Sequence, residues 1–543
     1  MILHYSVLNT DPENDITPLL EKWVLFVSVV FFIIILSWRL LLPIFLYPNT
    51  TGNFDSYIYA SRGVVLSCPP QSCPGMDSIR LQAGDPEANL DLIARTKTGI
   101  KTLGNDPASL KAHPIHPYLL FALHEAGLSW IDSYRWVSLG GGVLIIITCI
   151  ILMVTVFGPL GGGIGLCLLA LHLFVRQGYN LVIPSTLGIA FGMLAWWSLL
   201  KFGTNRILLT ITFIALAVGN HPMGQVFGGI GWIMLFLMFN HEAGMRKWII
   251  LFLLGLLLVF PLVIPYLEES QFPQRLFSFQ KREEWQGWAG IQLNLYTAFY
   301  VVYLSFSAFG GWVAGIILFI QGLFSLNHLP QPIRSRLWGL LVALTIMLFI
   351  SLFYVYPAVS ADLFVRVWVG AGTLVCGIIG YGFARWLMAS RKIFQHLRDK
   401  NFSFNSHPSK LLVHSFLGLL FCYGFISHQR TGWWNHHSEY IKTISIMDQA
   451  VDPNQIKRLL ELAPDRVLYQ VESLWMYFML QDTWRIPAVG AWLINNDEKQ
   501  IGRYLGNNSP PIWLPGILHS KLWESENQDI FVGVVFGLSK ENP

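Results

Sequence analysis

The chain has 543 residues, of which 53% are hydrophobic and 13% charged, and its mean hydropathy is +0.49. This composition excludes a soluble globular protein of ordinary core size and indicates a polytopic membrane protein. The net charge of +4 is small for this length, and no basic run is interleaved with aromatic residues, so nucleic-acid binding is set aside.

The amino-terminal residues 1–21 carry acids where a signal peptide has a basic region, and the apolar run that follows is too long for a signal peptide. The first span is therefore expected to be retained. Runs long enough to cross about 30 Å of hydrocarbon predict about eleven spans in chain order. These runs cover residues 23–47, 137–157, 164–182, 186–200, 207–219, 223–239, 248–267, 296–324, 337–356, 364–387 and 411–426.

Basic residues fall on alternate loops between these runs, which tests the orientation. Because cytoplasmic loops are enriched in Lys and Arg, these loops and the amino terminus are predicted to be cytoplasmic. The first loop, 48–115, and everything after residue 427 are then outside, as expected of a multi-pass protein of the inner cell membrane. The loop residues are Lys201, Arg206, Arg246, Lys247, Arg334, Arg336, Arg391, Lys392, Arg398 and Lys400.

The expected fold class is therefore mainly α: a polytopic transmembrane helical bundle, residues 1–427, followed by a small extracytoplasmic α/β domain, residues 428–543. A helical stretch after Pro453 and β-rich segments at 466–471 and 530–537 indicate that the tail folds. Glycine clusters at 140–142 and 161–163 indicate close helix packing or tight turns.

Asp55 follows the first apolar run by a few residues, at the start of the long outer loop. A carboxylate at the lipid–water boundary can take a proton from an acceptor while a lipid-borne donor lies in the bilayer beside it. Asp55 is therefore the predicted catalytic residue. The alternative is a capping or turn residue that closes the first span, because Asn and Asp also suit turns.

Two cysteines of the same loop, Cys68 and Cys73, flank a proline-rich turn. In an oxidising compartment they can form a small disulfide, and two free thiols fit the pattern equally well. The other cysteines lie inside apolar runs and are predicted to be packing residues. These are Cys149, Cys167, Cys376 and Cys422.

Several arginines fall near the predicted outer boundary, where the charge rule does not call for them. Arg62, Arg176 and Arg366 are the candidates for binding a phosphate, which the guanidinium group contacts with two hydrogen bonds. Asp362 stands four residues before Arg366, a helical spacing at which it can hold the guanidinium in place. The alternative for each arginine is a side chain that extends toward lipid head groups or forms a structural pair.

Histidines occur at two points where chain and membrane surface meet. Asn220-His221-Pro222 follows a run too short to reach the outer surface, so His221 is expected in a recess and is a candidate substrate contact. His116 is a second candidate, and the prolines around it favour an extended segment. A packing role fits His221 equally well. His113 and His116 lack the spacing of a zinc-binding helix, so no metal ligands are assigned.

The layout, with an early outer-loop acid, many spans and an outer carboxy-terminal domain, resembles the GT-C superfamily of integral membrane glycosyltransferases. The resemblance covers most of the chain in layout but rests on few residues. They are Asn53-Phe54-Asp55-Ser56-Tyr57, His116-Pro117, Ile183-Pro184-Ser185 and Asn220-His221-Pro222.

The resemblance implies transfer of a sugar from a polyprenyl-phosphate or polyprenyl-diphosphate carrier to an acceptor on the outer face, with Asp55 as general base. The partners would be the lipid-linked sugar donor, an acceptor that the sequence does not identify, and membrane lipids. Several relatives have a second acid beside the first, whereas Ser56 follows Asp55 here and the next acid is Asp77. The need for a divalent metal cofactor is therefore left open.

Two other classes of function fit the composition. A transporter or lipid flippase would have as many spans, although it would need neither the long outer loop nor the outer domain. A non-catalytic subunit for envelope assembly would use the outer domain and would tolerate substitution of Asp55.

Overall fold

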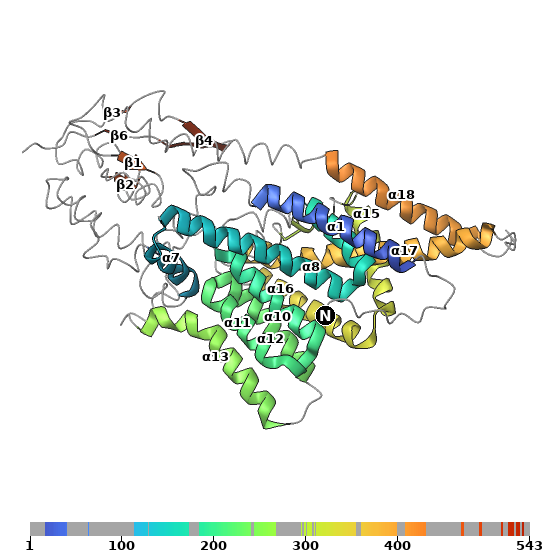
Figure 1. Ribbon diagram of the computed structural model, residues 1–543, viewed down its shortest axis with the longest axis horizontal. Coiled ribbons are helices and arrows are strands. Elements are labelled where there is room, and N and C mark those ends of the chain that lie inside the picture. The colour runs from blue at the N-terminus through green and yellow to red at the C-terminus, as the bar shows by residue number, and fades with distance from the viewer. Residues whose placement is uncertain are drawn as a thin grey trace, which may run out of the picture.

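The structure, a computed structural model, is a bundle of helices with a few short strands (Figure 1). It describes residues 17–40, 63, 113–128, 130–172, 184–239, 244–267, 295, 298–299, 301–303, 305–306, 309, 311–353, 360–398, 408–430, 469–471, 488–490, 512–513, 520–525, 528–532 and 535–536.

Apart from α7, which lies between the predicted runs 23–47 and 137–157, the helices of the bundle overlap the predicted apolar runs. They are α1 (Thr17–Leu40), α7 (Ile115–Glu125), α8 (Trp130–Leu171), α10 (Pro184–Phe202), α11 (Ile207–Asn220), α12 (Pro222–Met238), α13 (Met245–Leu267), α15 (Trp312–Ser325), α16 (Gln331–Phe353), α17 (Ser360–Arg398) and α18 (Pro408–Arg430). Short 3-10 helices, η1 (Gly203–Arg206) and η4 (Leu326–His328), follow α10 and α15.

Among the residues that the structure describes, four helical segments are long and apolar enough to cross a membrane: Asp132–Leu171, Ser185–Asn220, Gln331–Leu352 and Arg366–Arg391. Two shorter apolar helices, Pro222–Met238 and Trp312–His328, accompany them. These segments confirm a mainly helical chain with the character of a membrane protein. The first segment contains the predicted run 137–157 and the beginning of the run 164–182, and the second contains the runs 186–200 and 207–219. The total of about eleven spans and the orientation stay predictions.

The long helix α8 reverses direction at Gly158-Pro159. Gly158 has φ 72° and ψ 178°, a backbone conformation open to glycine and strained for other residues. A Cβ atom on Gly162 would lie 2.7 Å from the carbonyl oxygen of Met153, so the second half of the helix packs against the first. The prediction that glycines 161–163 serve close packing is thereby confirmed.

Helix α17 lies at the centre of the bundle, and 94% of its apolar window is buried. It packs against α8, α15 and α16 through glycines that let backbones approach. A Cβ on Gly161 would meet Tyr381, and one on Gly165 would meet Gly377. Because later residues of α8 meet earlier residues of α17, the second half of α8 runs antiparallel to α17.

Helices α10, α12 and α17 run in the same direction. Gly188 packs against Gly224, and Gly192 one turn later packs against Phe227. Phe227 stacks on Trp196, with ring centroids 4.9 Å apart, and both rings contact Gly370 of α17. The starts of α10, α12 and α17 therefore lie at one end of the bundle, together with the end of α11 and the end of α8. This end is called the histidine end below.

The opposite end gathers basic residues from loops far apart in the sequence, and is called the basic end. Arg336 Nη1 donates to the carbonyl oxygens of Leu200 and Lys201, at 3.0 Å each. Lys247 Nζ donates to the carbonyl oxygen of Phe239 at 3.3 Å. The predicted alternation of basic loops thus corresponds to one end of the fold.

One predicted span is wrong in its extent. The run 296–324 was expected to be one span, but α15 begins only at Trp312, after Gly311 with φ 107°. A Cβ on Gly315 would lie 2.3 Å from the carbonyl oxygen of Phe306, so the chain bends sharply there.

The prediction that four cysteines pack inside the bundle is wrong for Cys422. The side chain of Cys422 is exposed, whereas Cys149 and Cys376 are buried as expected.

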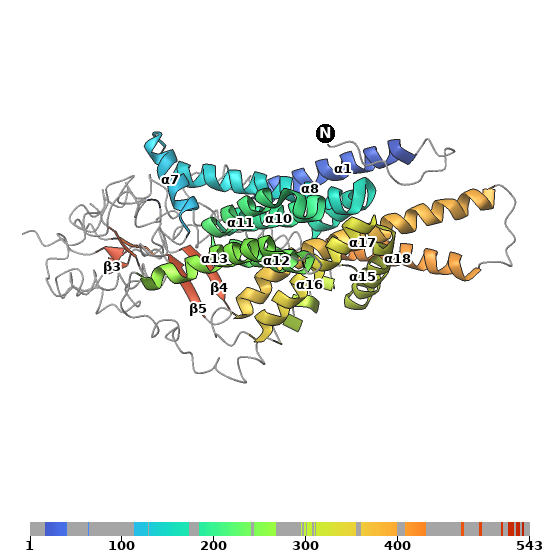
Figure 2. The same ribbon diagram turned by 90° about the horizontal axis from the view of Figure 1, so that it is seen from below.

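The carboxy-terminal part contains three pairs of short strands. β1 (Tyr469–Val471) pairs with β2 (Ala488–Gly490) in parallel, and antiparallel pairs join β3 (Ile512–Trp513) to β6 (Val535–Phe536) and β4 (Ser520–Ser525) to β5 (Gln528–Val532). In both views these strands lie toward the end of the bundle where α7 lies (Figures 1 and 2). The α/β domain of residues 428–543 stays a prediction.

Candidate substrate-binding site at the histidine end

Among the described residues, four histidine side chains are buried at or next to the histidine end. They are His113, His116, His172 and His221, with exposed fractions of 8, 1, 1 and 2%. A buried imidazole in an apolar bundle must find hydrogen-bond partners to offset the loss of water. Their partners show which helix ends the histidines join.

His221 forms the corner between α11 and α12. Its extended backbone ends α11, and its Nδ1 accepts a hydrogen bond from the backbone N–H of Met223 at 3.1 Å. Pro222 occupies the first position of α12, where a missing N–H costs nothing. His221 therefore acts as the N-cap of α12 and is buried, and the recess expected around it stays a prediction.

Asn220, next to it, is fully buried. Its Nδ2 donates to the carbonyl oxygen of Leu216 at 2.7 Å, whereas no described residue donates to its Oδ1. A buried amide oxygen without a donor is costly unless a ligand or water supplies one. Asn220 was named in the sequence only as part of the turn, and the structure makes it a candidate contact in its own right.

The start of α7 lies against the same corner. His113 Nδ1 lies 2.8 Å from the carbonyl oxygen of Val218, so this nitrogen donates a hydrogen bond. A Cβ on Gly219 would come within 2.7 Å of the Ile115 side chain. The ring of His116 meets Tyr134 of α8 edge-on, with centroids 5.9 Å apart. His116 and His221, predicted separately, thus belong to neighbouring helix ends.

The expectation of an extended segment around His116 is wrong, because α7 begins at Ile115 and both His116 and Pro117 lie in its first turn. The first turn of a helix has backbone N–H groups without partners, so proline is tolerated there. Pro114 caps the helix with helical dihedrals, φ −76° and ψ −25°. The two prolines therefore start this helix.

A second polar group joins α8 to α17. His172 Nε2 lies 3.1 Å from the carbonyl oxygen of Ser305. Ser305 Oγ accepts a hydrogen bond from Trp368 Nε1 at 2.7 Å and donates to the carbonyl oxygen of Val301 at 2.8 Å. His172 was missed in the sequence because it lies inside an apolar run.

Arg366 precedes Trp368 by two residues on α17, and its side chain is partly exposed. Arg366 lies one helical turn, about 6 Å, before Gly370, and His221 lies six residues, about 9 Å, before Phe227. Gly370 and Phe227 are in contact. Because α12 and α17 run in parallel, Arg366 and His221 lie at similar depth at the histidine end.

An apolar groove opens beside the buried polar side chains of the histidine end, between α7, α8 and the start of α10. Its volume is about 690 Å³. Leu119, which lines it, lies one turn after His116, and Trp136 at its rim is 55% exposed. The groove is lined by Leu119, Leu123, Leu128, Trp136, Val137, Gly140, Leu144 and Leu187.

The remaining predicted site residues cannot be placed. Asp55, Arg62 and Arg176 lie outside the described residues, as do Cys68 and Cys73. Asp362 is part of α17, but its side chain is outside the described set, so its pairing with Arg366 stays a prediction. No three potential ligands gather into a metal-binding group within the described part of the chain.

Arg135, near the start of α8, illustrates the structural alternative of an arginine that forms an ion pair within the protein. Its Nη1 lies 3.4 Å from Asp132 Oδ1 on the same helix, and the arginine side chain is 18% exposed. This pair accounts for Arg135 without a phosphate ligand.

Comparisons with known proteins leave the family open. No protein-family model matches the chain, and no characterised protein shows significant sequence similarity to it. The resemblance to membrane glycosyltransferases therefore remains an inference from layout and a few residues.

Proposed function

We propose that this protein is a membrane glycosyltransferase that moves a sugar from a polyprenyl-phosphate or polyprenyl-diphosphate carrier to an acceptor on the outer face of the membrane. The observation that carries the proposal is the apolar groove of about 690 Å³ beside buried polar side chains at the histidine end. A lipid-linked sugar needs both surfaces, because its isoprenoid chain is apolar and its sugar phosphate is polar.

The polar side chains have separate roles in the proposal. His116, Asn220 and His221 contact the sugar, whose hydroxyl groups supply the donor that Asn220 Oδ1 lacks among the described residues. Arg366, oriented by Asp362, binds the lipid phosphate, with help from Arg176 and Arg62. The chain of the carrier lies in the groove against Leu187 and Trp136.

The reaction is an inverting displacement. Asp55 accepts the proton of the acceptor hydroxyl as that oxygen forms a bond to the anomeric carbon. The bond from this carbon to the phosphate oxygen breaks, and the electron pair leaves with the lipid phosphate. Positive charge at Arg366 offsets the negative charge that develops on the leaving group.

The proposal includes the finer topology: about eleven spans, cytoplasmic amino terminus, inner-membrane location and an extracytoplasmic α/β domain. A transporter or flippase remains the main alternative. Transporters commonly hold ionisable residues near the middle of the membrane. The acids and bases of the apolar window Arg366–Arg391 are Arg366, Arg385 and Arg391, all near its ends, which favours chemistry at the surface.

The decisive experiment measures sugar transfer from radiolabelled polyprenyl-phosphate-linked and polyprenyl-diphosphate-linked sugars by the purified protein. Asp55→Asn should lower the rate about a hundredfold to ten-thousandfold, as expected for loss of a positioned base, at unchanged membrane abundance. Asp132→Asn is the matched control, because Asp132 is a half-exposed acid paired with Arg135; it should retain transfer. Full activity of Asp55→Asn, or no transfer by the wild type from any such donor, would reject the proposal.

A further inference from the structure

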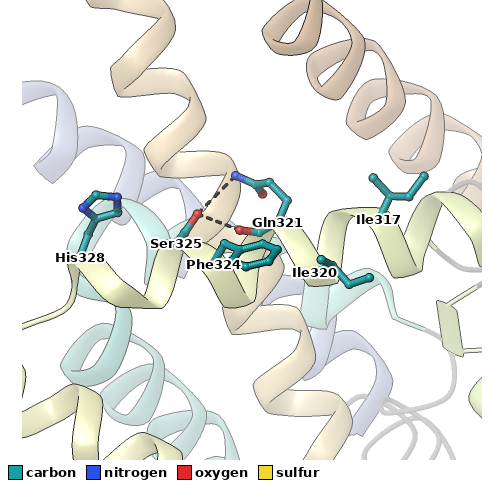
Figure 3. Close-up of a pocket in the computed structure, with 6 residues that line it drawn as sticks. All are labelled: Ile317, Ile320, Gln321, Phe324, Ser325 and His328. Atoms are coloured by element: carbon teal, nitrogen blue, oxygen red, sulfur yellow. Dashed lines mark hydrogen bonds between the residues drawn. The ribbon is translucent and has the colours of Figure 1, made fainter. Parts of the chain in front are cut away.

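A second groove lies on the opposite side of the fold, at the basic end, with a volume of about 420 Å³. One wall is apolar and open to the surroundings, because Ile317, Ile320 and Phe324 are 36, 45 and 71% exposed. The other residues that line it, Gln321, Ser325 and His328, are polar. Figure 3 shows the polar residues continuing toward His328 and the apolar ones toward Ile317.

The polar floor is held by hydrogen bonds, one of which reaches the central helix α17. Gln321 Nε2 donates to the carbonyl oxygen of Gly382 at 3.1 Å, which fastens α15 to α17. Ser325 Oγ donates to the carbonyl oxygen of Gln321 at 2.9 Å, and Gln321 Nε2 also lies 3.3 Å from Ser325 Oγ (Figure 3). The groove is thus a built feature of the packed helices, because its floor residues are held in place.

Positive charge surrounds the end of the groove at His328. Two effects lower the pKa of His328: partial burial of its imidazole ring and, after that, the nearby positive charge of Arg385. Arg385 lies one turn after Gly382 on α17. No described residue forms a hydrogen bond or an ion pair with Arg385. Arg334 Nη1 donates to the carbonyl oxygen of Asn327, the residue before His328, at 2.9 Å. An anion is the ligand that such a rim favours.

We propose that this groove binds an anionic phospholipid, with its phosphate between His328 and Arg385 and an acyl chain along Ile320 and Ile317. The apolar wall open to the surroundings favours a lipid over a soluble anion, and the positive charge of Arg385, which no described residue pairs with, selects an anionic head group over a zwitterionic one. This site is independent of sugar transfer and lies at the other end of the bundle.

The test measures phospholipid binding to the full-length detergent-purified protein by native mass spectrometry. Phosphatidylglycerol is compared with phosphatidylcholine that has the same acyl chains, and phosphatidylglycerol should bind more tightly. Arg385→Gln should weaken its binding about fivefold, the effect of one basic residue near an anionic lipid surface. Arg385→Lys should restore most of the affinity, because the positive charge returns. Arg246→Gln, an exposed arginine of the same end in α13, is the matched control and should bind as the wild type does.

A substitution that fills the groove without changing its charge provides a second test. Ile320→Trp should weaken binding of the lipid while the thermal unfolding of the lipid-free protein stays close to that of the wild type, because Ile320 is 45% exposed. Equal binding of the two lipids, or phosphatidylglycerol binding unchanged in both Arg385→Gln and Ile320→Trp, would overturn the proposal. Displacement of the lipid by equimolar inorganic phosphate would also overturn it, because it would show a phosphate site without a lipid chain.

Discussion

Gly165 of α8 and Gly377 of α17 pack backbone against backbone: a Cβ atom on Gly165 would lie 3.0 Å from the Cα of Gly377. A side chain at position 165 would push the two backbones apart, whereas a Cβ on Gly377 would meet Phe157 and Met153 of the first half of α8. The contact holds the returning half of α8 against the central helix, and through it fixes His172 near Trp368. The geometry of the histidine end therefore depends on small residues in the middle of the bundle.

Replacement of Gly380 by alanine should destabilise the protein by about 1–3 kcal/mol, the usual range for forcing extra volume into a packed core. A Cβ at this position would lie 2.5 Å from the backbone nitrogen of Gly165, and a backbone atom cannot move aside as a side-chain end can. Unfolding in mixed detergent micelles measures the change. Gly339→Ala is the control, because a Cβ there meets nothing within 4 Å; it should be neutral or stabilise the helix by up to about 1 kcal/mol. Equal effects of the two changes would contradict the role of close packing.

Substitutions of His221 can separate its role as a helix cap from a role as a substrate contact. Asparagine is among the best N-cap residues, so His221→Asn should preserve the hydrogen bond to Met223 N–H and leave stability within about 0.5 kcal/mol of the wild type. If His221 also contacts the sugar, sugar transfer should fall although the protein remains folded. The measurement pairs thermal unfolding with the transfer assay.

His221→Ala is the comparison for this pair, because it removes both the cap and the imidazole. It should cost about 0.5–2 kcal/mol of stability, as loss of an N-cap does. Wild-type transfer by a stable His221→Asn protein would show that His221 serves only as a cap, and would remove it from the proposed site.

The parts of the fold that could be predicted from the sequence are those with local causes. Pro184 and Pro222 start helices because proline suits the first turn, and apolar runs of sufficient length mark the helices themselves. The break at Gly311 could not be read from hydropathy, because an apolar run looks the same whether or not the backbone bends within it. The pair Gly310-Gly311 was the available signal.

The candidate site was harder to predict because its members are distant in the chain. His172 depends on Ser305, 133 residues away, and neither residue has a neighbouring motif that indicates the contact. His116 and His221 were named from their positions next to prolines, but their common location follows from the packing of α7 against α11. Sequence patterns identify helix ends, whereas only packing shows which ends meet.

The anionic-lipid groove should bind more tightly as the pH falls. Burial and Arg385 lower the pKa of His328 below its ordinary value, about 6.5 in unstructured peptides, so this side chain is neutral at pH 7. Protonation below that lowered pKa adds a positive charge beside Arg385 and strengthens the attraction to a phosphate. The other charged or titratable groups of the packed helices near His328 are Arg385, Tyr381 and Arg334, and the predicted change between pH 7.5 and 5.5 is assigned to His328 among the described residues.

Stability of the lipid-free protein should change in the opposite direction. Between the lowered pKa of folded His328 and the ordinary value, the unfolded chain binds more protons than the folded one, so the unfolding free energy falls as the pH falls. Bound phosphatidylglycerol should reduce this loss, because it favours the protonated form and raises the pKa. His328→Gln should abolish both the pH dependence of lipid affinity and this part of the stability change. Lipid titrations and unfolding at pH 7.5 and 5.5 test both effects, and a His328→Gln protein with wild-type pH dependence would place the titrating group elsewhere.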